Sequence, residues 1–226
     1  MSEKASKMVD GVVDGSIDMV QKGHELELRR LLSQLEHAKI PDSVCEETAP
    51  RIGNLLDEES GGCDGERLAF VCDAKNWCRS GFRVVIDGGS EKNRTRVMRY
   101  LMFRAIVARW DAMAFVVSTY DWPTILPIVC DYKHPGRLPT VEGMRSAKVL
   151  GLAEVDPTVA MTPGVEAILT SVLRGRSQSG RPTVITLRKV FDPRRHAGAG
   201  EIHALAVAKH DVGEDKIVRL RLAGGI

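Results

Sequence analysis

The sequence predicts an α/β protein with a mixed β-sheet flanked by helices, followed by a β-rich C-terminal part. Residues 17–38 carry apolar side chains at helical spacing, which indicates an amphipathic helix. Short apolar runs then alternate with a second helical stretch, residues 91–110. From residue 183 onward, β-prone apolar runs recur along the chain. Helices and strands are therefore expected to alternate in the first half, with strands dominating the end.

Two helices and three strands are expected before residue 91. Ser16 is the expected N-cap of the helix over 17–38, and Pro41 follows the end of that helix. Ser43 opens a capping box that begins a short second helix. The expected strands cover residues 52–57, 67–75 and 82–86, and the turn 87–89 follows the last of them.

The helix over 91–110 carries arginines at positions 94, 99, 104 and 109. Five residues advance the chain by about 140° beyond a full turn, so these side chains spiral around the helix axis. The spiral argues against a single basic face. It favours a mostly buried helix whose arginines extend outward to solvent. A buried strand is expected next, over residues 112–119.

The second half is expected to begin irregularly and to end as β-structure. Residues 125–129 predict a strand, and prolines 127, 135 and 139 mark irregular connections. Pro163 fits the first turn of a helix that runs to about residue 173. Further strands are expected over 183–191, 202–210 and 216–222. The expected organisation is an α/β domain over 1–122 and a β-rich extension over 123–226, with membership of one common domain left open.

The composition is that of a globular protein of 226 residues, with 43% hydrophobic and 27% charged residues. Because no run of about 18 uncharged apolar residues occurs, no membrane span is expected. The five cysteines include no CxxC pair and match no zinc-ligand spacing. Reduced thiols and a cytoplasmic location are therefore expected.

Charge is distributed unevenly along the chain, although the net charge is only +2. Residues 1–80 contain 10 Lys+Arg and 16 Asp+Glu, a balance of −6, whereas residues 81–226 contain 22 and 14, a balance of +8. The basic part fits a polyanionic ligand such as DNA, and it fits an ordinary solvated surface equally well. The arginines expected to contact phosphates are Arg174, Arg176, Arg181, Arg194 and Arg195.

A candidate catalytic site lies where two expected strands end. Asp57 closes the first of these strands, and Asp73 and Lys75 close the second on a shared face, because side chains alternate along a strand. Paired carboxylates hold a divalent cation in metal-dependent phosphodiesterases, and a lysine neutralises charge or positions the attacking water. The alternative is that these are turn residues and a solvated strand end.

The order of an acid-bearing strand, a strand ending in Asp73-Ala74-Lys75, a helix and the apolar strand over 114–119 resembles the PD-(D/E)xK nuclease superfamily. The resemblance covers about residues 17–120 and implies a restriction endonuclease-like fold. It implies that Asp57 and Asp73 bind Mg²⁺ or Mn²⁺ and that Lys75 acts in catalysis. Glu27 on the first helix, or its neighbour Glu25, would complete the metal site.

The implied function is Mg²⁺-dependent hydrolysis of DNA in a restriction, repair or mobile-element setting, with a homodimer left open. Leu56 stands where the superfamily has its signature proline, and Asp73 stands where glutamate is commoner. The alternative function is therefore a non-catalytic binding or structural protein of a phage or plasmid on a degenerate nuclease-like fold. Whether the chain is an enzyme stays open at this point.

Overall fold

The computed structural model describes residues 29–30, 33–41, 43–44, 49–56, 73, 81–108, 117–156, 163–188 and 217–223. The helices of this part of the chain include α2 (Ala49–Gly53), α5 (Glu91–Ala108), α6 (Trp122–Cys130), α7 (Arg137–Ser146) and α9 (Pro163–Gln178). The strands are β1 (Arg83–Gly88), β2 (Val117–Asp121), β3 (Val149–Val155), β4 (Thr183–Leu187) and β5 (Ile217–Leu222).

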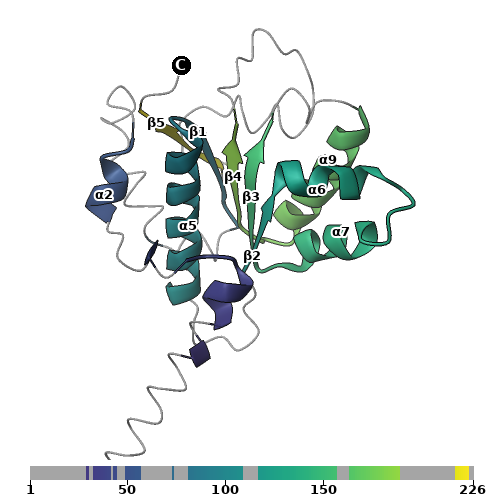
Figure 1. Cartoon of the computed structure of the whole chain (residues 1–226), viewed down its shortest axis with the longest axis horizontal. Helices are drawn as coiled ribbons and strands as arrows, with labels where there is room; N and C mark the ends of the chain where they lie inside the picture. Colours follow the sequence, from purple (N-terminus) through teal and green to yellow (C-terminus); the bar gives the residue numbers. More distant parts are fainter. Residues whose placement is uncertain are drawn as a thin grey trace, which may run out of the picture.

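The five described strands form one sheet in the order β2-β3-β4-β1-β5 (Figure 1). Every pairing between them is parallel. The expected sheet flanked by helices is confirmed, but its expected mixed character is wrong for this part of the chain. The sheet combines strands from both sides of residue 122. β1 pairs with β4 and β5 of the second half, and β2 pairs with β3.

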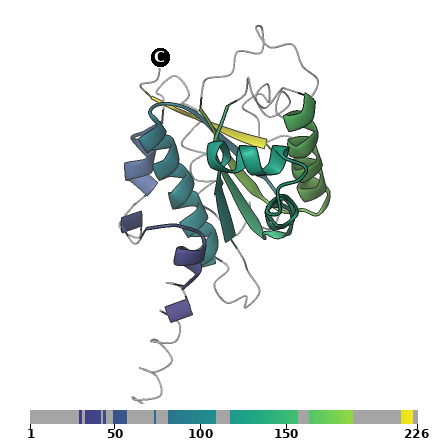
Figure 2. The same cartoon turned by 45° about the vertical axis from the view of Figure 1, so that its right-hand side comes forward.

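Helices cover both faces of the sheet (Figures 1 and 2). The chain crosses from β1 to β2 through α5 on one face, and it steps back through β3 to β4 by way of α6, α7 and α9 on the other. Right-handed crossovers require the connecting helices to change from one face of the sheet to the other when the chain reverses its direction along the sheet. Two buried clusters result: Val84 and Ile86 of β1 point to the α5 side, and Val85 points to the α9 side.

Helix α5 begins where the sequence predicts it, although β1 extends through the first two residues of the expected turn, to Gly88. Ser90 caps the helix, because its Oγ accepts a hydrogen bond from the backbone N–H of Asn93 at 3.2 Å. Val97, Leu101 and Ala105, spaced four residues apart, are completely buried on the side of the helix that packs against the sheet. The helix expected to start at Pro163 is also confirmed, although it runs past residue 173 to Gln178.

Two expected strands are helical instead. Residues 125–129 lie inside α6, where the Asp121 carboxylate caps the helix and Pro123 occupies its first turn. Pro127 also lies within this helix. Residues 52–53 belong to α2, residues 54–55 form a turn, and Leu56 bridges Leu222 antiparallel.

Other expectations fall on residues outside the described ranges. These are the strand over 202–210, the first residues of the strand over 112–119, and all of the strand over 67–75 except Asp73. The strand over 67–75 therefore stays a prediction. The described residues 117–119 of the other segment belong to β2, which pairs with β3. Among the described helices, none is long and apolar enough to cross a membrane.

Candidate functional site at the carboxyl edge of the sheet

The turn between β1 and α5 lies at the carboxyl edge of the sheet, next to the ends of β3 and β4. In parallel α/β sheets, ligands bind outside the carboxyl ends of the strands at the point where the strand order reverses. That point is β1 here, because the chain leaves it toward β2 and later passes it to form β5. The polar side chains of this edge are therefore the first place to look for function.

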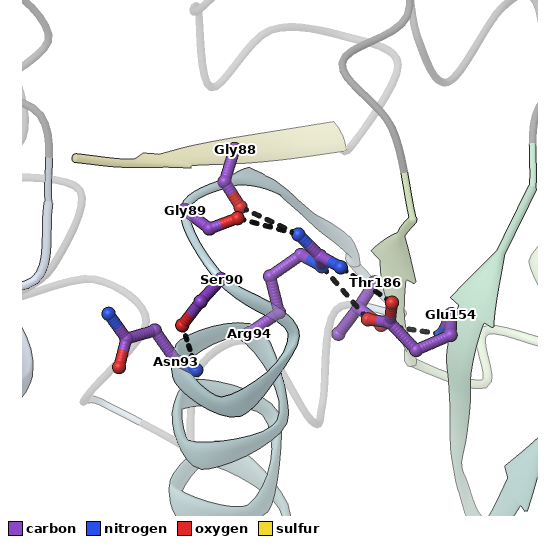
Figure 3. Close-up of polar contacts among 7 residues, drawn as sticks. All are labelled: Gly88, Gly89, Ser90, Asn93, Arg94, Glu154 and Thr186. Atoms are coloured by element: carbon purple, nitrogen blue, oxygen red, sulfur yellow. Dashed lines mark hydrogen bonds and ion pairs between the residues drawn. The ribbon is translucent and has the colours of Figure 1, made fainter. Parts of the chain in front are cut away.

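Arg94 on the first turns of α5 is buried at this edge and is 6% exposed (Figure 3). Its Nη1 donates to the carbonyl oxygens of Gly88 and Gly89, at 3.0 and 2.8 Å. Its Nε and Nη2 donate to the two carboxylate oxygens of Glu154 on β3, at 2.8 and 2.6 Å. The expectation that the α5 arginines extend to solvent is wrong for Arg94, because its guanidinium is fully engaged inside.

Glu154 is held from several directions. Its backbone is left-handed, with φ of 57°, beside a break in the β3–β4 register. Its N–H donates to Thr186 Oγ1 at 2.7 Å, and that hydroxyl donates to the Glu154 carboxylate at 3.0 Å (Figure 3). A non-glycine residue in this conformation costs on the order of 1–3 kcal/mol, and such strain concentrates at functional sites. The ion pair and the threonine offset that cost.

The two glycines of the turn are required by their conformation and by close packing. Gly88 and Gly89 have φ of 73° and 54°, the region that side chains disfavour. A Cβ on Gly88 would lie 2.6 Å from the carbonyl oxygen of Leu222 in β5. The glycines therefore let the end of β5 approach the turn. Leu222 of β5 and the Arg94 side chain together hold the turn in place.

A second buried ion pair involves the end of β1. Asp87 is fully buried on the opposite face of the strand from Ile86, and it accepts a hydrogen bond from Arg219 Nε at 3.0 Å. Arg219 Nη2 contacts the same carboxylate, and Arg221 Nε lies 3.5 Å from it. Asp87 is thus a strand residue with two arginine partners on β5, and not the simple turn residue expected from the glycines that follow it.

A cleft of about 260 Å³ opens beside Glu154, between α5 and the end of β2. Its lining contains two cations, Lys39 and Arg99, and three carboxylates, those of Glu91, Asp121 and Glu154. Tyr120 contributes a half-buried hydroxyl, and burial raises its pKa, so this hydroxyl is neutral. The described residues contain no group of three or more His, Cys, Asp or Glu side chains that could hold a metal ion.

The site expected to catalyse stays a prediction, because only one of its residues, Asp73, lies in the described part of the chain. Asp73 is exposed, and Glu27, Asp57 and Lys75 lie outside the described ranges. Of the expected phosphate-binding arginines, Arg174 is exposed on α9 and Arg181 is half-buried. Arg176 is buried, with 1% exposure, so its guanidinium is not at the surface. Arg194 and Arg195 are not among the described residues.

Several solved structures resemble this chain. Domain III of the replication initiation protein DnaA from Thermotoga maritima matches with a TM-score of 0.51 at 16% identity, covering 70% of this chain and 63% of that one. A DNA replication initiation factor also gives 0.51, at 8% identity, with coverages of 72% and 46%. AMPPCP-bound DnaA from Aquifex aeolicus gives 0.47 at 11% identity, with coverages of 70% and 46%. The chain thus spans between 46% and 63% of the length of these proteins. No protein-family model and no curated sequence matches it.

These neighbours are AAA+ domains of the P-loop ATPase class, and at such identities the likeness concerns the fold alone. The expected resemblance to PD-(D/E)xK nucleases is therefore wrong. Metal-dependent DNA hydrolysis falls with it, and so does the alternative of a degenerate nuclease-like scaffold. The physical reason is that three dispersed side chains do not define a fold, whereas the strand order does.

The fold raises the question of whether the β1–α5 turn suits a magnesium nucleotide. P-loop proteins bind phosphates with a strand, the sequence GxxxxGK[ST] and a helix, and the backbone N–H groups of the loop point at the phosphates. Residues 88–95 read GGSEKNRT, with Asn93 and Arg94 where the motif has glycine and lysine. Helix α5 begins at Glu91, only two residues after β1 ends.

The described residues do not fit that group. The turn directs the carbonyl oxygens of Gly88 and Gly89 at Arg94, and carbonyl oxygens repel phosphate. The Glu154 carboxylate, which would otherwise be available to a cation, is occupied by the guanidinium. The sequence signal for this site is a strand that ends in two glycines and is followed at once by a helix. That pattern by itself predicts a turn and does not reveal the buried ion pair.

Proposed function

We propose that this chain is a DNA-binding domain of the replication machinery that contacts single-stranded DNA through a cleft on its α6–α7–α9 side. The setting is supported by the two neighbours with TM-scores above 0.5, which are by name a replication initiation protein and a replication initiation factor. The contact surface is proposed from the chain's own residues. The single observation that carries it is an exposed tyrosine stacked with an arginine at the rim of a basic cleft.

The cleft, called here the Tyr132 cleft, has a volume of about 220 Å³. Its lining consists of Tyr132, Arg137, Val141, Arg145, Gly164, Ala167, Ile168 and Ser171. Tyr132 is 79% exposed, and the guanidinium carbon of Arg137 lies 4.4 Å from the centre of its ring. Arg137 is fixed in that position because its Nε donates to the Val129 carbonyl at 2.9 Å. The aromatic ring is therefore held out from the surface by a positioned cation.

Positive charge continues around this rim. Arg145 reaches across the cleft to Ser171 Oγ at 2.5 Å, and its Nη1 lies 3.3 Å from the exposed carboxylate of Glu142. Lys133 is exposed beside Tyr132, and Arg174 is exposed on α9 one turn beyond Ser171. Arginines that neutralise phosphates, combined with an aromatic face on which bases stack, are the means by which proteins bind single strands without reading sequence. The floor of Val141 and Ile168 offers an apolar surface to a base.

Mg²⁺ and a homodimer stay predictions, and the proposed DNA contact depends on neither. Arg174 and Arg181 keep their expected role near phosphate in this proposal. Arg176 does not, because its side chain is inside the protein.

Tyr132→Ala should weaken binding to a fluorescein-labelled oligo(dT) by about 5- to 150-fold, the loss of one base stack. Tyr132→Phe should bind as the wild type does, because only the ring is needed. Fluorescence anisotropy of the full chain at several salt concentrations measures both effects. Arg145→Ala should also make the salt dependence shallower by roughly one phosphate contact.

Lys92→Ala is the matched control, since Lys92 is an exposed cation on α5, across the sheet from the cleft. Its affinity should stay close to that of the wild type. Equal affinity of Tyr132→Ala and wild type would place DNA binding elsewhere. Preference for duplex over single-stranded DNA would contradict stacking as the mode of contact.

A further inference from the structure

We infer that the Arg94–Glu154 ion pair takes the place of a magnesium nucleotide in this chain, so that the carboxyl edge of the sheet is ordered without any nucleotide. The inference concerns a different face of the molecule from the Tyr132 cleft and does not depend on it. It rests on three features of the β1–α5 turn.

The first feature is the position of the guanidinium. Arg94 occupies the place in the GxxxxGK[ST] spacing at which a P-loop lysine reaches the phosphates. Here it makes two contacts with turn carbonyls and two with Glu154. A phosphate that entered would have to remove Arg94 from Glu154, and the side chains of this pair are only 7% and 6% exposed. Separation would leave a buried carboxylate without its cation, which is strongly unfavourable.

The second feature is the length and polarity of the turn. The first-turn N–H of Asn93 already bonds to Ser90 Oγ, and the N–H of Arg94 bonds to the Ser90 carbonyl at 3.0 Å. These groups cap the helix and are not directed at an empty anion site. Gly88 and Gly89 are packed against Leu222, so the turn has no room to open toward β5 without moving that strand.

The third feature is the balance of charge and strain. Arg94 and Glu154 cancel each other, whereas a P-loop site carries an excess of positive charge that phosphates neutralise. Glu154 adopts its left-handed backbone with Thr186 and Arg94 as partners. Arg94 and Glu154 are therefore both needed to hold the end of β3 in place. In proteins that bind a ligand, the ligand can stabilise the folded site in the same way.

Two measurements on the full chain test the inference. In the first, wild-type protein is titrated with Mg²⁺–ATP and Mg²⁺–ADP by calorimetry, and its melting temperature is recorded with each at millimolar concentration. No saturable heat and no change in melting temperature are expected. Saturable binding at micromolar concentration with a rise of several degrees would overturn the inference, because it would show that the edge does accept a nucleotide.

In the second, Arg94→Met, Glu154→Met and the double variant are melted beside the wild type. Each single variant should lose on the order of 10 °C, because it leaves one buried charge unpaired. The double variant should be more stable than the sum of the single losses predicts. Lys92→Met, an exposed change on the same helix, should melt within about 2 °C of the wild type.

Arg94→Lys keeps the inference falsifiable where a methionine variant fails to fold. Lysine retains the charge but cannot make the two parallel bonds to Glu154, so a smaller loss than that of Arg94→Met is expected. Losses that simply add in the double variant, or an Arg94→Lys protein as stable as the wild type, would show that this pair does not organise the edge. Failure of DNA binding at the Tyr132 cleft would leave both measurements unaffected.

Discussion

Asp87→Ala should lower the free energy of unfolding by about 3–5 kcal/mol, the loss expected when one partner of a buried ion pair is removed. Asp87 is fully buried, and it meets Arg219 and Arg221 of the neighbouring strand. In the variant, the buried guanidinium of Arg219, which is 8% exposed, keeps its charge but loses its contacts with the Asp87 carboxylate. Because β5 is the edge strand of the described sheet beside β1, the loss should loosen the pairing of these two strands. Urea unfolding followed by circular dichroism measures the effect.

Asp87→Asn separates charge from shape. It keeps an oxygen that accepts a hydrogen bond and removes the negative charge, so its loss should fall between the wild type and Asp87→Ala. Asp131→Ala is the control, because Asp131 is an exposed aspartate at the end of α6. It should cost no more than about 1 kcal/mol through its bond to the Lys133 N–H. An Asp87→Ala protein within 1 kcal/mol of the wild type would show that the ion pair contributes little.

Local patterns were sufficient for part of the fold. The apolar run of β1, the start of α5 at Glu91 and the proline at the start of α9 each depend on a few neighbouring residues, so the sequence predicts them directly. α6 was misread because Ile125 and Val129 favour strands and Pro127 disfavours helices. Packing decided otherwise, since Trp122, Ile125 and Val129 share one buried side of that helix.

β3 was not recognised because its signal is diluted. Gly151 interrupts the apolar run, and glycine weakens a strand prediction. The reason for the glycine is visible only in the fold: a Cβ there would lie 2.6 Å from Thr119 Cγ2 of the neighbouring strand. With β3 missing from the prediction, the all-parallel strand order could not be derived. The expected nuclease-like sheet had a different source, the Asp73-Ala74-Lys75 motif and the strands expected around it.

The site could not be predicted from spacing alone. Arg94 and Glu154 are separated by 60 positions and meet only because β3 lies two strands from β1. The regular spacing of arginines on α5 predicts that their side chains extend to solvent. Arg94 is buried instead because Glu154 of β3 supplies a carboxylate partner, and the helix sequence alone does not reveal that partner. The same holds for Asp87, whose partners on β5 lie more than 130 positions away.

Arg176→Met should lower the free energy of unfolding by about 3–5 kcal/mol, because several buried carbonyl groups lose their donor together. Arg176 donates to Thr183 Oγ1 at 2.9 Å and to four carbonyl oxygens. These belong to Met144, Arg145, Ala147 and Pro182, at 2.9, 3.4, 2.7 and 2.6 Å. Its side chain thus joins the end of α7 to α9 and to the start of β4. Burial, with the nearby charge of Arg181, lowers the pKa of Arg176 to about 9, so the guanidinium is still charged at neutral pH.

Arg176→Lys should recover only part of that loss, because an ammonium group has three donors and cannot reproduce the planar fork. Arg174→Met, an exposed change two residues away on the same helix, should cost less than about 1 kcal/mol. Urea unfolding of the three variants gives the stabilities, and anisotropy at low temperature gives the DNA affinity of the folded fraction. That affinity should be unchanged in Arg176→Met, since the side chain is internal. An Arg176→Met protein that is as stable as the wild type but loses DNA binding would indicate that Arg176 contacts DNA at the surface. That result would contradict its role in joining α7, α9 and β4.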